Sequence, residues 1–176
     1  MILQNEICEV HISIDTTYTV ESTDNRHYDI VLNPFHKKHN DFYTAFGIKI
    51  DLFYENIDLV LIGDFTTICD DCALIENNVL TVLINDAIVQ IDVKNGTMIC
   101  CKEVHCVGET GGIYRVQNGY LVLEEYALMM LDFEFKEKWS FTGKERFCIW
   151  QSPEFSETSI RVQDIDNHFY EVDYMD

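Results

Sequence analysis

The sequence predicts an all-β, mainly antiparallel fold, built either as propeller-like repeats of about 40 residues or as an open β-meander packed as a sandwich. Three observations support this fold class. The apolar runs are short, they are rich in Val, Ile, Tyr, Phe and Thr, and they are bounded by Asn, Asp and Gly. A short pattern recurs along the chain at a nearly constant spacing. Signals for helices are scarce.

Strand-length apolar runs occur from one end of the chain to the other. The clearest of them cover residues 10–14, 48–50, 59–62, 79–84 and 120–123. One short helix is expected at residues 34–43, because Asn33 is a good N-cap residue and Pro34 suits the first helical position. We expect this helix to cover one edge of the strands.

The recurring pattern is an apolar residue, any residue, an apolar residue and then Asp. It ends at Asp15, Asp51, Asp92, Asp132 and Asp173, which are spaced 36, 41, 40 and 41 residues apart. A period near 40 that holds three or four short strands is typical of a propeller blade. We interpret the five Asp residues as turn formers at strand ends.

The segment 88–96 resembles the quinoprotein-type (PQQ-like) β-propeller repeat, in which an apolar strand ends in Asp, a Gly-containing turn follows, and the next strand often carries Trp. Here Asp92 and Gly96 supply the first two features, and Trp139 follows Asp132 in the next unit. The resemblance extends over about residues 73–174 and implies stacked four-stranded blades. None of the family's cofactor-binding residues is matched, so no quinone and no other cofactor is expected.

The length of 176 residues accommodates at most four such blades. The last Asp lies three residues before the end of the sequence, so its blade is expected to lack an outer strand. The strand around residues 7–14 is expected to complete that blade and close a ring; otherwise the units form an open meander. We expect one domain over 1–176, or a β-rich part with the short helix over 1–60 followed by a repeat part over 61–176.

The charge is strongly negative. There are 31 acidic and 12 basic residues, a formal net charge of −19, and the excess of acids runs along the whole chain. Such a field repels nucleic-acid phosphates and anionic membranes, and it accelerates association with basic partners. We therefore expect a basic protein partner, and neither nucleic acid nor membrane.

The location predicted from the sequence is the cytoplasm. The first residues show no basic and apolar regions of a signal peptide, and no apolar run approaches the ~18 residues of a membrane span. The seven cysteines are an odd number and are unevenly spaced, which favours reduced thiols.

A zinc site is one hypothesis for the cysteines. The candidate ligands are Cys69, Cys72, Cys101, His105 and Cys106. Two thiolates in a CxxC spacing can bind one Zn²⁺, and a second pair can close a tetrahedral site. Only one of Cys100 and Cys101 can be a ligand, because neighbouring residues of a strand point to opposite faces, and Cys101 is the candidate of the two. The ordinary alternative is thiols that bind no metal, and the expectation for the chain is no metal.

No catalytic residue is predicted, because the chain contains no phosphate-binding Gly-rich loop, GxSxG elbow, HExxH motif or dinucleotide fingerprint. We expect a non-catalytic acidic protein that binds a basic macromolecule, such as an inhibitor or an immunity protein against a cationic nuclease toxin. Clustered acids are the candidate partner-binding residues: Asp70, Asp71, Glu124, Glu125, Asp164 and Asp166. The alternatives are a small propeller-like protein-interaction scaffold and a hydrolase that uses paired carboxylates.

Overall fold

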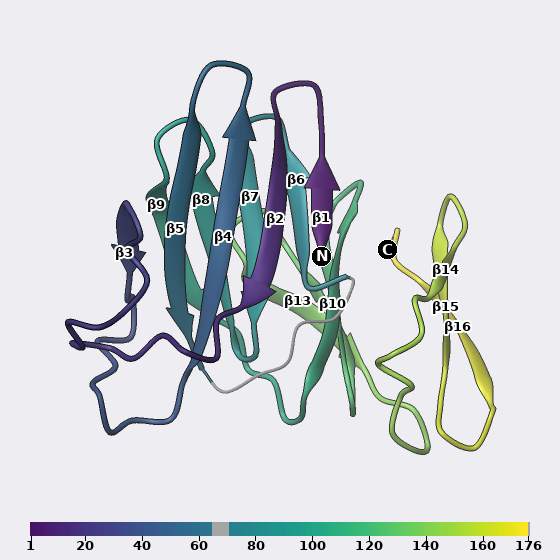
Figure 1. Ribbon diagram of the computed structural model, residues 1–176. Helices are drawn as coiled ribbons and strands as arrows, with labels where there is room; N and C mark the ends of the chain where they lie inside the picture. The colour runs from purple at the N-terminus through teal and green to yellow at the C-terminus, as the bar shows by residue number, and fades with distance from the viewer. Residues whose placement is uncertain (65–70, 176) are drawn as a thin grey trace.

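The computed structural model describes residues 1–64 and 71–175, which form four successive β-sheets (Figure 1). The first sheet contains, in spatial order, β1 (Ile2–Gln4), β2 (Cys8–Ile14), β4 (Thr44–Leu52), β5 (Asn56–Gly63) and β3 (Ile30–Leu32). The second contains β6 (Ala73–Glu76), β7 (Val79–Ile84), β8 (Ala87–Asp92) and β9 (Thr97–Glu103). The third contains β10 (Thr110–Val116), β11 (Gly119–Glu124), β12 (Leu128–Leu131) and β13 (Glu137–Phe141). The fourth contains β14 (Glu154–Phe155), β15 (Ser159–Gln163) and β16 (Phe169–Asp173).

Neighbouring strands in these sheets run antiparallel, and the short β3, which lies parallel to β5, is the exception. In the second, third and fourth sheets each strand pairs with the strand that follows it in the chain. The expected all-β, mainly antiparallel fold with repeated meanders is therefore confirmed.

The sheets stack face to face in chain order, and a separate hydrophobic core lies in each space between them. Alternate residues of each strand point into one of these cores. The first core joins the first and second sheets through side chains such as Val10, Ile48, Leu59, Leu80 and Val89. The second core joins the second and third sheets, and the third core joins the third and fourth sheets. Full burial of one such aliphatic side chain contributes about 1.5–3 kcal/mol to the stability of the fold. Because each core has its own set of side chains, each interface between neighbouring sheets is stabilised separately.

The recurring Asp residues lie at equivalent places in the four sheets. Asp51, Asp92, Asp132 and Asp173 each stand at the end of the third strand in spatial order. Asp15 differs, because it follows β2, the second strand of its sheet. In the second, third and fourth sheets the Asp side chain accepts a hydrogen bond from the backbone N–H two residues later, at 2.8–2.9 Å. These three residues are turn formers, as the sequence predicts.

Asp51 has a different role from the other three. Strand β4 continues past it to Leu52, whose backbone N–H donates to the carbonyl oxygen of Glu55 at 2.9 Å and closes the turn. The Asp51 side chain lies on the outer face of the first sheet, where it forms an ion pair with Lys49 at 2.6 Å. Its carboxylate therefore binds a side chain on the face of the sheet, whereas those of the other three Asp residues bind backbone N–H groups.

The expected closure of a ring by residues 7–14 is wrong. Strand β2 pairs with β1 on one side and with β4 on the other, and β16 is an edge strand within the described part of the fourth sheet. The apolar side chains of β2 point into the first core, so β2 belongs to the first sheet. Part of the opposite face of this sheet is covered by the 15–43 segment, through Val20 and Tyr28. The four sheets form an open stack (Figure 1).

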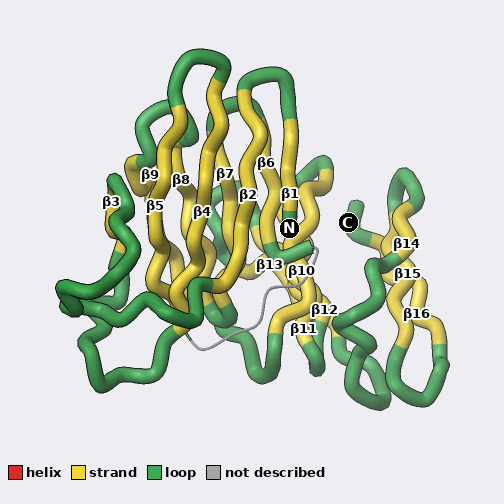
Figure 2. Tube along the Cα trace, viewed as in Figure 1, coloured by secondary structure: helices red, strands yellow, loops and turns green. Residues whose placement is uncertain are grey.

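The expected helix at 34–43 is also wrong, and Figure 2 shows only strands and loops over the described residues. Asn33 does bind the backbone ahead of it, but it donates to the Lys37 carbonyl at 2.8 Å and accepts from the Lys37 N–H at 2.9 Å, which closes a turn. His36 has a φ of 52°, and this left-handed conformation interrupts a helical path. Since the described residues form no helix, none of them forms a helical membrane span.

Candidate functional site

The cysteines predicted as zinc ligands do not converge. Cys69 lies outside the described residues. Cys101 packs against the first core, whereas Cys106 packs against the second core, on the other side of the second sheet. Cys100 packs on the side opposite to Cys101, as strand alternation predicts. Burial, together with the carboxylates of Glu124 and Asp86, raises the pKa of Cys106 to about 12, so this thiol is protonated at neutral pH in the metal-free chain.

Two of the predicted partner-binding acids have structural roles. Glu124 is only 1% exposed, and its Oε2 accepts hydrogen bonds from the backbone N–H groups of Val107 (2.6 Å) and Gly108 (3.1 Å). Burial raises the pKa of this carboxyl, against the effect of those two bonds. Glu125 next to it forms an ion pair with Arg146 at 3.1 Å. Glu124 therefore holds the loop after β9 and is not accessible to a partner.

Asp164 organises the turn between β15 and β16. Its side chain is fully buried and accepts hydrogen bonds from the backbone N–H groups of Asp166 (3.0 Å) and His168 (2.9 Å) and from the Tyr170 hydroxyl (2.8 Å). Burial raises the pKa of the Asp164 carboxyl, but the hydrogen bonds from His168 and Tyr170 outweigh it and hold the pKa below its ordinary value. Of this pair, only Asp166 is exposed.

Asp71 is the predicted acid that lies at a hollow in the surface; its neighbour Asp70 is outside the described residues. We call this hollow the inner groove. It has a volume of about 370 Å³, and it lies where the first strands of the second, third and fourth sheets approach one another. Its walls are formed by Asp71, Ala73, Leu74, Ile75, Glu76, Ile113, Tyr114, Arg115 and Phe155.

One side of the inner groove combines a carboxylate with aromatic rings. Asp71 Oδ2 accepts hydrogen bonds from the Tyr114 hydroxyl (2.9 Å) and from the Ser152 hydroxyl (2.7 Å). The rings of Tyr114 and Phe155 lie 5.1 Å apart, and Phe155 is 45% exposed. Among the described residues, Asp71 has no basic side chain within ion-pair distance.

The other side of the inner groove carries an ion pair. Arg115 Nε lies 3.0 Å from Glu76 Oε1, and the Tyr120 hydroxyl donates to the second oxygen of Glu76 at 3.3 Å. The guanidinium of Arg115 also stacks over the Phe133 ring at 4.2 Å. Because Glu76 is neutralised in this way, Asp71 provides the negative charge of the groove. The arrangement suits a cationic side chain, which a carboxylate and an aromatic face bind together.

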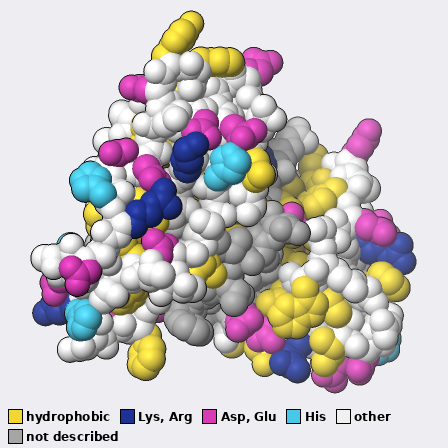
Figure 3. Space-filling view, in the orientation of Figure 1, with side chains coloured by type: hydrophobic (Ala, Val, Ile, Leu, Met, Phe, Trp, Pro, Cys, Tyr) yellow, Lys and Arg dark blue, Asp and Glu magenta, His cyan; other side chains and the backbone are white. Residues whose placement is uncertain are grey.

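The surface has many more acidic than basic groups. In Figure 3 acidic side chains are spread over the visible face, and each cluster of basic side chains lies close to an acid. Within the described residues nine acidic side chains form ion pairs with Lys, Arg or His. Most of the acidic side chains of residues 1–64 and 71–175 therefore have no ion-pair partner within that part of the chain.

Sequence reasoning missed one constellation. In the part of the chain that the structure describes, a single group of three or more His, Cys, Asp and Glu side chains has ligand atoms within 4.8 Å of one another, and its members are Glu9, His11 and Asp51. The alternation of β2 indicates that Glu9 and His11 share a face, but the pairing of Glu9 with Asp51 depends on the register of β2 and β4.

Comparisons with known proteins add information about the fold. No protein-family model matches the chain, and no curated protein matches it in sequence. Among solved structures, the computationally designed Ika4 protein is similar with a TM-score of 0.50 and 8% identity, over 88% of this chain and 95% of that chain. Hsv2 from Kluyvelomyces marxianus has a TM-score of 0.42 and 9% identity, over 74% of this chain and 44% of that chain. The likeness to Ika4 is one of fold. At such low identity it carries no functional residue over to this chain.

Proposed function

We propose that the protein is a non-catalytic, cytoplasmic binding protein that engages a basic protein partner, in the way that an inhibitor or an immunity protein engages a cationic nuclease toxin. The observation that carries this proposal is the net charge of −19, together with the finding that most acids of the described residues have no ion-pair partner among those residues. A negative surface of this kind attracts a positive surface over a distance of about a Debye length, ~8 Å at physiological ionic strength.

The inner groove is the proposed contact point for a Lys or Arg side chain of the partner. Asp71 offers a carboxylate without a cationic neighbour among the described residues, and the exposed ring of Phe155 offers a face for a cation–π contact. A cation over an aromatic face contributes about 0.5–1 kcal/mol at an exposed site and more when water is excluded. The free cysteines of the described residues are consistent with the reducing conditions of the cytoplasm.

The first experiment measures the association rate of a labelled arginine-rich peptide by stopped-flow fluorescence at rising salt concentration. We expect the rate to fall steeply between about 0.1 M and 1 M salt, because the Debye length decreases from ~10 Å to ~3 Å. A rate that hardly changes with salt would contradict the electrostatic proposal and favour the alternative of an interaction scaffold with apolar contacts.

The second experiment tests the groove itself. N-acetyl-arginine amide is titrated into labelled protein, and amide signals are followed by NMR. We expect shifts concentrated at residues 71–76, 113–115 and 155. The variant Asp71→Asn should weaken this binding about three- to tenfold, whereas Asp166→Asn, an exposed acid outside the groove, should leave it nearly unchanged. Equal effects of the two variants would show that the ligand binds the general surface and would rule the groove out.

A further inference from the structure

The outer face of the first sheet has an apolar half and a polar half. The apolar half, which includes Val60 and Ile62, is covered by the 15–43 segment. In the polar half the alternation of β2 and β4 sends Glu9, His11 and Asp51 outward, while their neighbours along each strand point into the first core. These three side chains are half-buried, and they lie on paired strands in the interior of the sheet, not on a loop.

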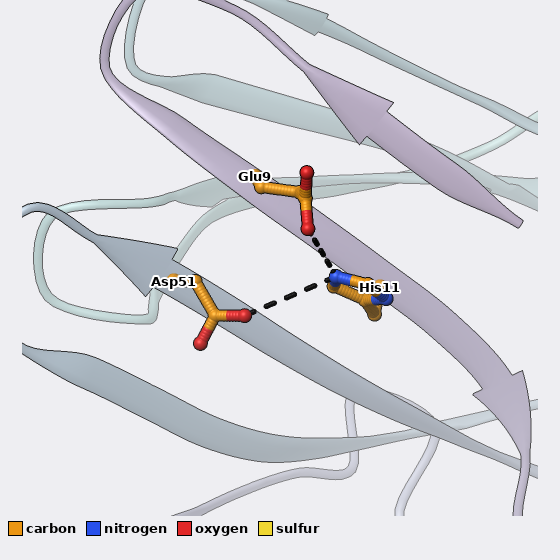
Figure 4. A group of neighbouring side chains, drawn as sticks. All are labelled: Glu9, His11 and Asp51. Atoms are coloured by element: carbon orange, nitrogen blue, oxygen red, sulfur yellow. Dashed lines mark hydrogen bonds and ion pairs between the residues drawn. The ribbon is translucent and has the colours of Figure 1, made fainter.

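The three side chains point toward one another. Glu9 and His11 are two residues apart on β2, and Asp51 is the cross-strand partner of Glu9 on β4. His11 Nε2 lies 2.6 Å from Glu9 Oε1 and 3.9 Å from Asp51 Oδ2 (Figure 4). All three ligand atoms lie within 4.8 Å of one another. Two carboxylates and one imidazole therefore surround a single point on the sheet surface.

We propose that Glu9, His11 and Asp51 form a binding site for a first-row divalent transition-metal ion such as Zn²⁺. Zinc bonds to imidazole nitrogen and carboxylate oxygen are about 2.0–2.2 Å long, so tetrahedral ligand atoms lie roughly 3.3–3.6 Å apart. His11 Nε2 lies 2.6 Å from Glu9 Oε1 and 3.9 Å from Asp51 Oδ2, and these two distances bracket that value. Side-chain rotations that move the ligand atoms by less than about 1 Å would make the distances equal. Imidazole with carboxylate suits such metals, whereas Ca²⁺ takes six to eight oxygen ligands.

A comparison of Asp51 with the equivalent Asp residues of the other three sheets supports this assignment. Its counterparts Asp92, Asp132 and Asp173 use the carboxylate to close a turn. At Asp51 the turn is closed by backbone groups of Leu52 and Glu55, and the carboxylate binds side chains instead: Lys49 Nζ at 2.6 Å and the Asn56 amide nitrogen at 3.1 Å. The acid at this position in the first sheet therefore faces His11 and not the turn backbone.

A cation already occupies part of this location. The ammonium group of Lys49, the cross-strand partner of His11, lies 2.6 Å from Asp51 Oδ1 and 2.9 Å from Asp51 Oδ2. The Lys49 side chain is about half exposed, so it can swing into solvent when a metal ion binds. Lys49 thus competes with the metal for Asp51, and its removal should strengthen metal binding.

The surroundings leave space for further ligands. A hollow of about 210 Å³ adjoins His11 and Lys49 on one side of the cluster, and another of about 160 Å³ adjoins Glu9 and Asp51 on the other side. A metal ion with three protein ligands keeps an open position for water or for an anionic group, and either hollow can accommodate it.

The experiment uses the whole chain and Co²⁺, a paramagnetic ion that prefers the same ligands as Zn²⁺. Line broadening in NMR spectra locates the bound ion among the amide signals, and calorimetry with Zn²⁺ gives the affinity. We expect broadening centred on residues 8–12 and 48–52. His11→Gln should weaken Zn²⁺ binding at least tenfold, since loss of even an outer-shell partner of a metal ligand costs ten- to a hundredfold. Lys49→Gln should tighten it about tenfold, because it removes a positive charge next to the ion.

The matched control is His39→Gln, which removes an exposed histidine outside the cluster. The protein with this substitution should bind Zn²⁺ as tightly as the unaltered chain. Thermal unfolding without metal checks that each variant is folded, and all three replaced residues are at least partly exposed. Broadening centred on the cysteines of residues 100–106 would overturn the proposal. So would equal affinities of the His11→Gln and His39→Gln variants, or a Lys49→Gln variant that binds no more tightly than the unaltered chain.

Discussion

Replacement of Phe147 by Ala tests whether the fourth sheet is held mainly by the core that it shares with the third sheet. Phe147 is only 1% exposed, and its ring packs 6.4 Å from that of Phe141 and 5.8 Å from that of Tyr170, measured between ring centres. Truncation of a buried Phe to Ala costs about 3–5 kcal/mol, which includes the cavity that is left behind. Because each sheet contacts only its neighbours in the stack, the lost stabilisation should make the fourth sheet, at the end of the stack, unfold more readily than the others.

The assay combines urea unfolding with hydrogen exchange. We expect the free energy of unfolding to fall by about 3–5 kcal/mol, and the amides of β15 and β16 to lose protection before those of the first and second sheets. Phe42→Ala is the matched control, because Phe42 is 83% exposed and its truncation should change stability by less than about 0.5 kcal/mol. A loss below about 1 kcal/mol in Phe147→Ala, or an equal loss of protection in all four sheets, would refute the reasoning.

Two further variants test local features. Gly119 has a φ of 149°, and a Cβ there would clash with the Leu131 carbonyl oxygen. Gly119→Ala should therefore lower the free energy of unfolding by more than about 1 kcal/mol in urea titrations. Replacement of the exposed Gln117 by Ala is the control, and a similar result for both variants would contradict the steric argument. Because burial raises the pKa of Glu124, the folded state binds its proton more tightly than the unfolded state does, and this group makes stability decline as pH rises from the ordinary glutamate value through the raised pKa. Glu124→Gln should remove that decline in unfolding titrations between about pH 4 and pH 8, and unchanged slopes would count against the assigned pKa direction.

The repeat could be predicted from the sequence because its signals are local. An Asp at the end of a strand binds the backbone two residues later, and this interaction depends only on neighbouring residues. Asp92 and Asp132 therefore mark the same turn in two sheets, and a search by period detects them. The apolar runs around them fill both faces of their strands, since the second and third sheets are covered on both sides.

The predictions of a helix and of ring closure were wrong because the actual structure depends on features that the local sequence does not contain. The capping signals of Asn33 and Pro34 suit a turn as well as a helix, and the left-handed conformation of His36 decides between them. The partner of β2 depends on which sheet buries its apolar face. Ile12 and Val10 fit the core against the second sheet, and this contact between distant segments fixes β2 beside β4.

The Glu9–His11–Asp51 cluster could not be predicted for a related reason. Five acids end the recurring pattern, and the sequence assigns all of them the same role. Only the register of β2 and β4 shows that Asp51 faces Glu9 across the strands, and only the backbone turn after Leu52 shows that its carboxylate is not needed there. Where repeated units share a structural residue, a unit that closes its turn by other means has a side chain available for another task. In this chain that unit is the first sheet, and the side chain that it makes available lies beside the imidazole of His11, in the position where a metal ion would need it.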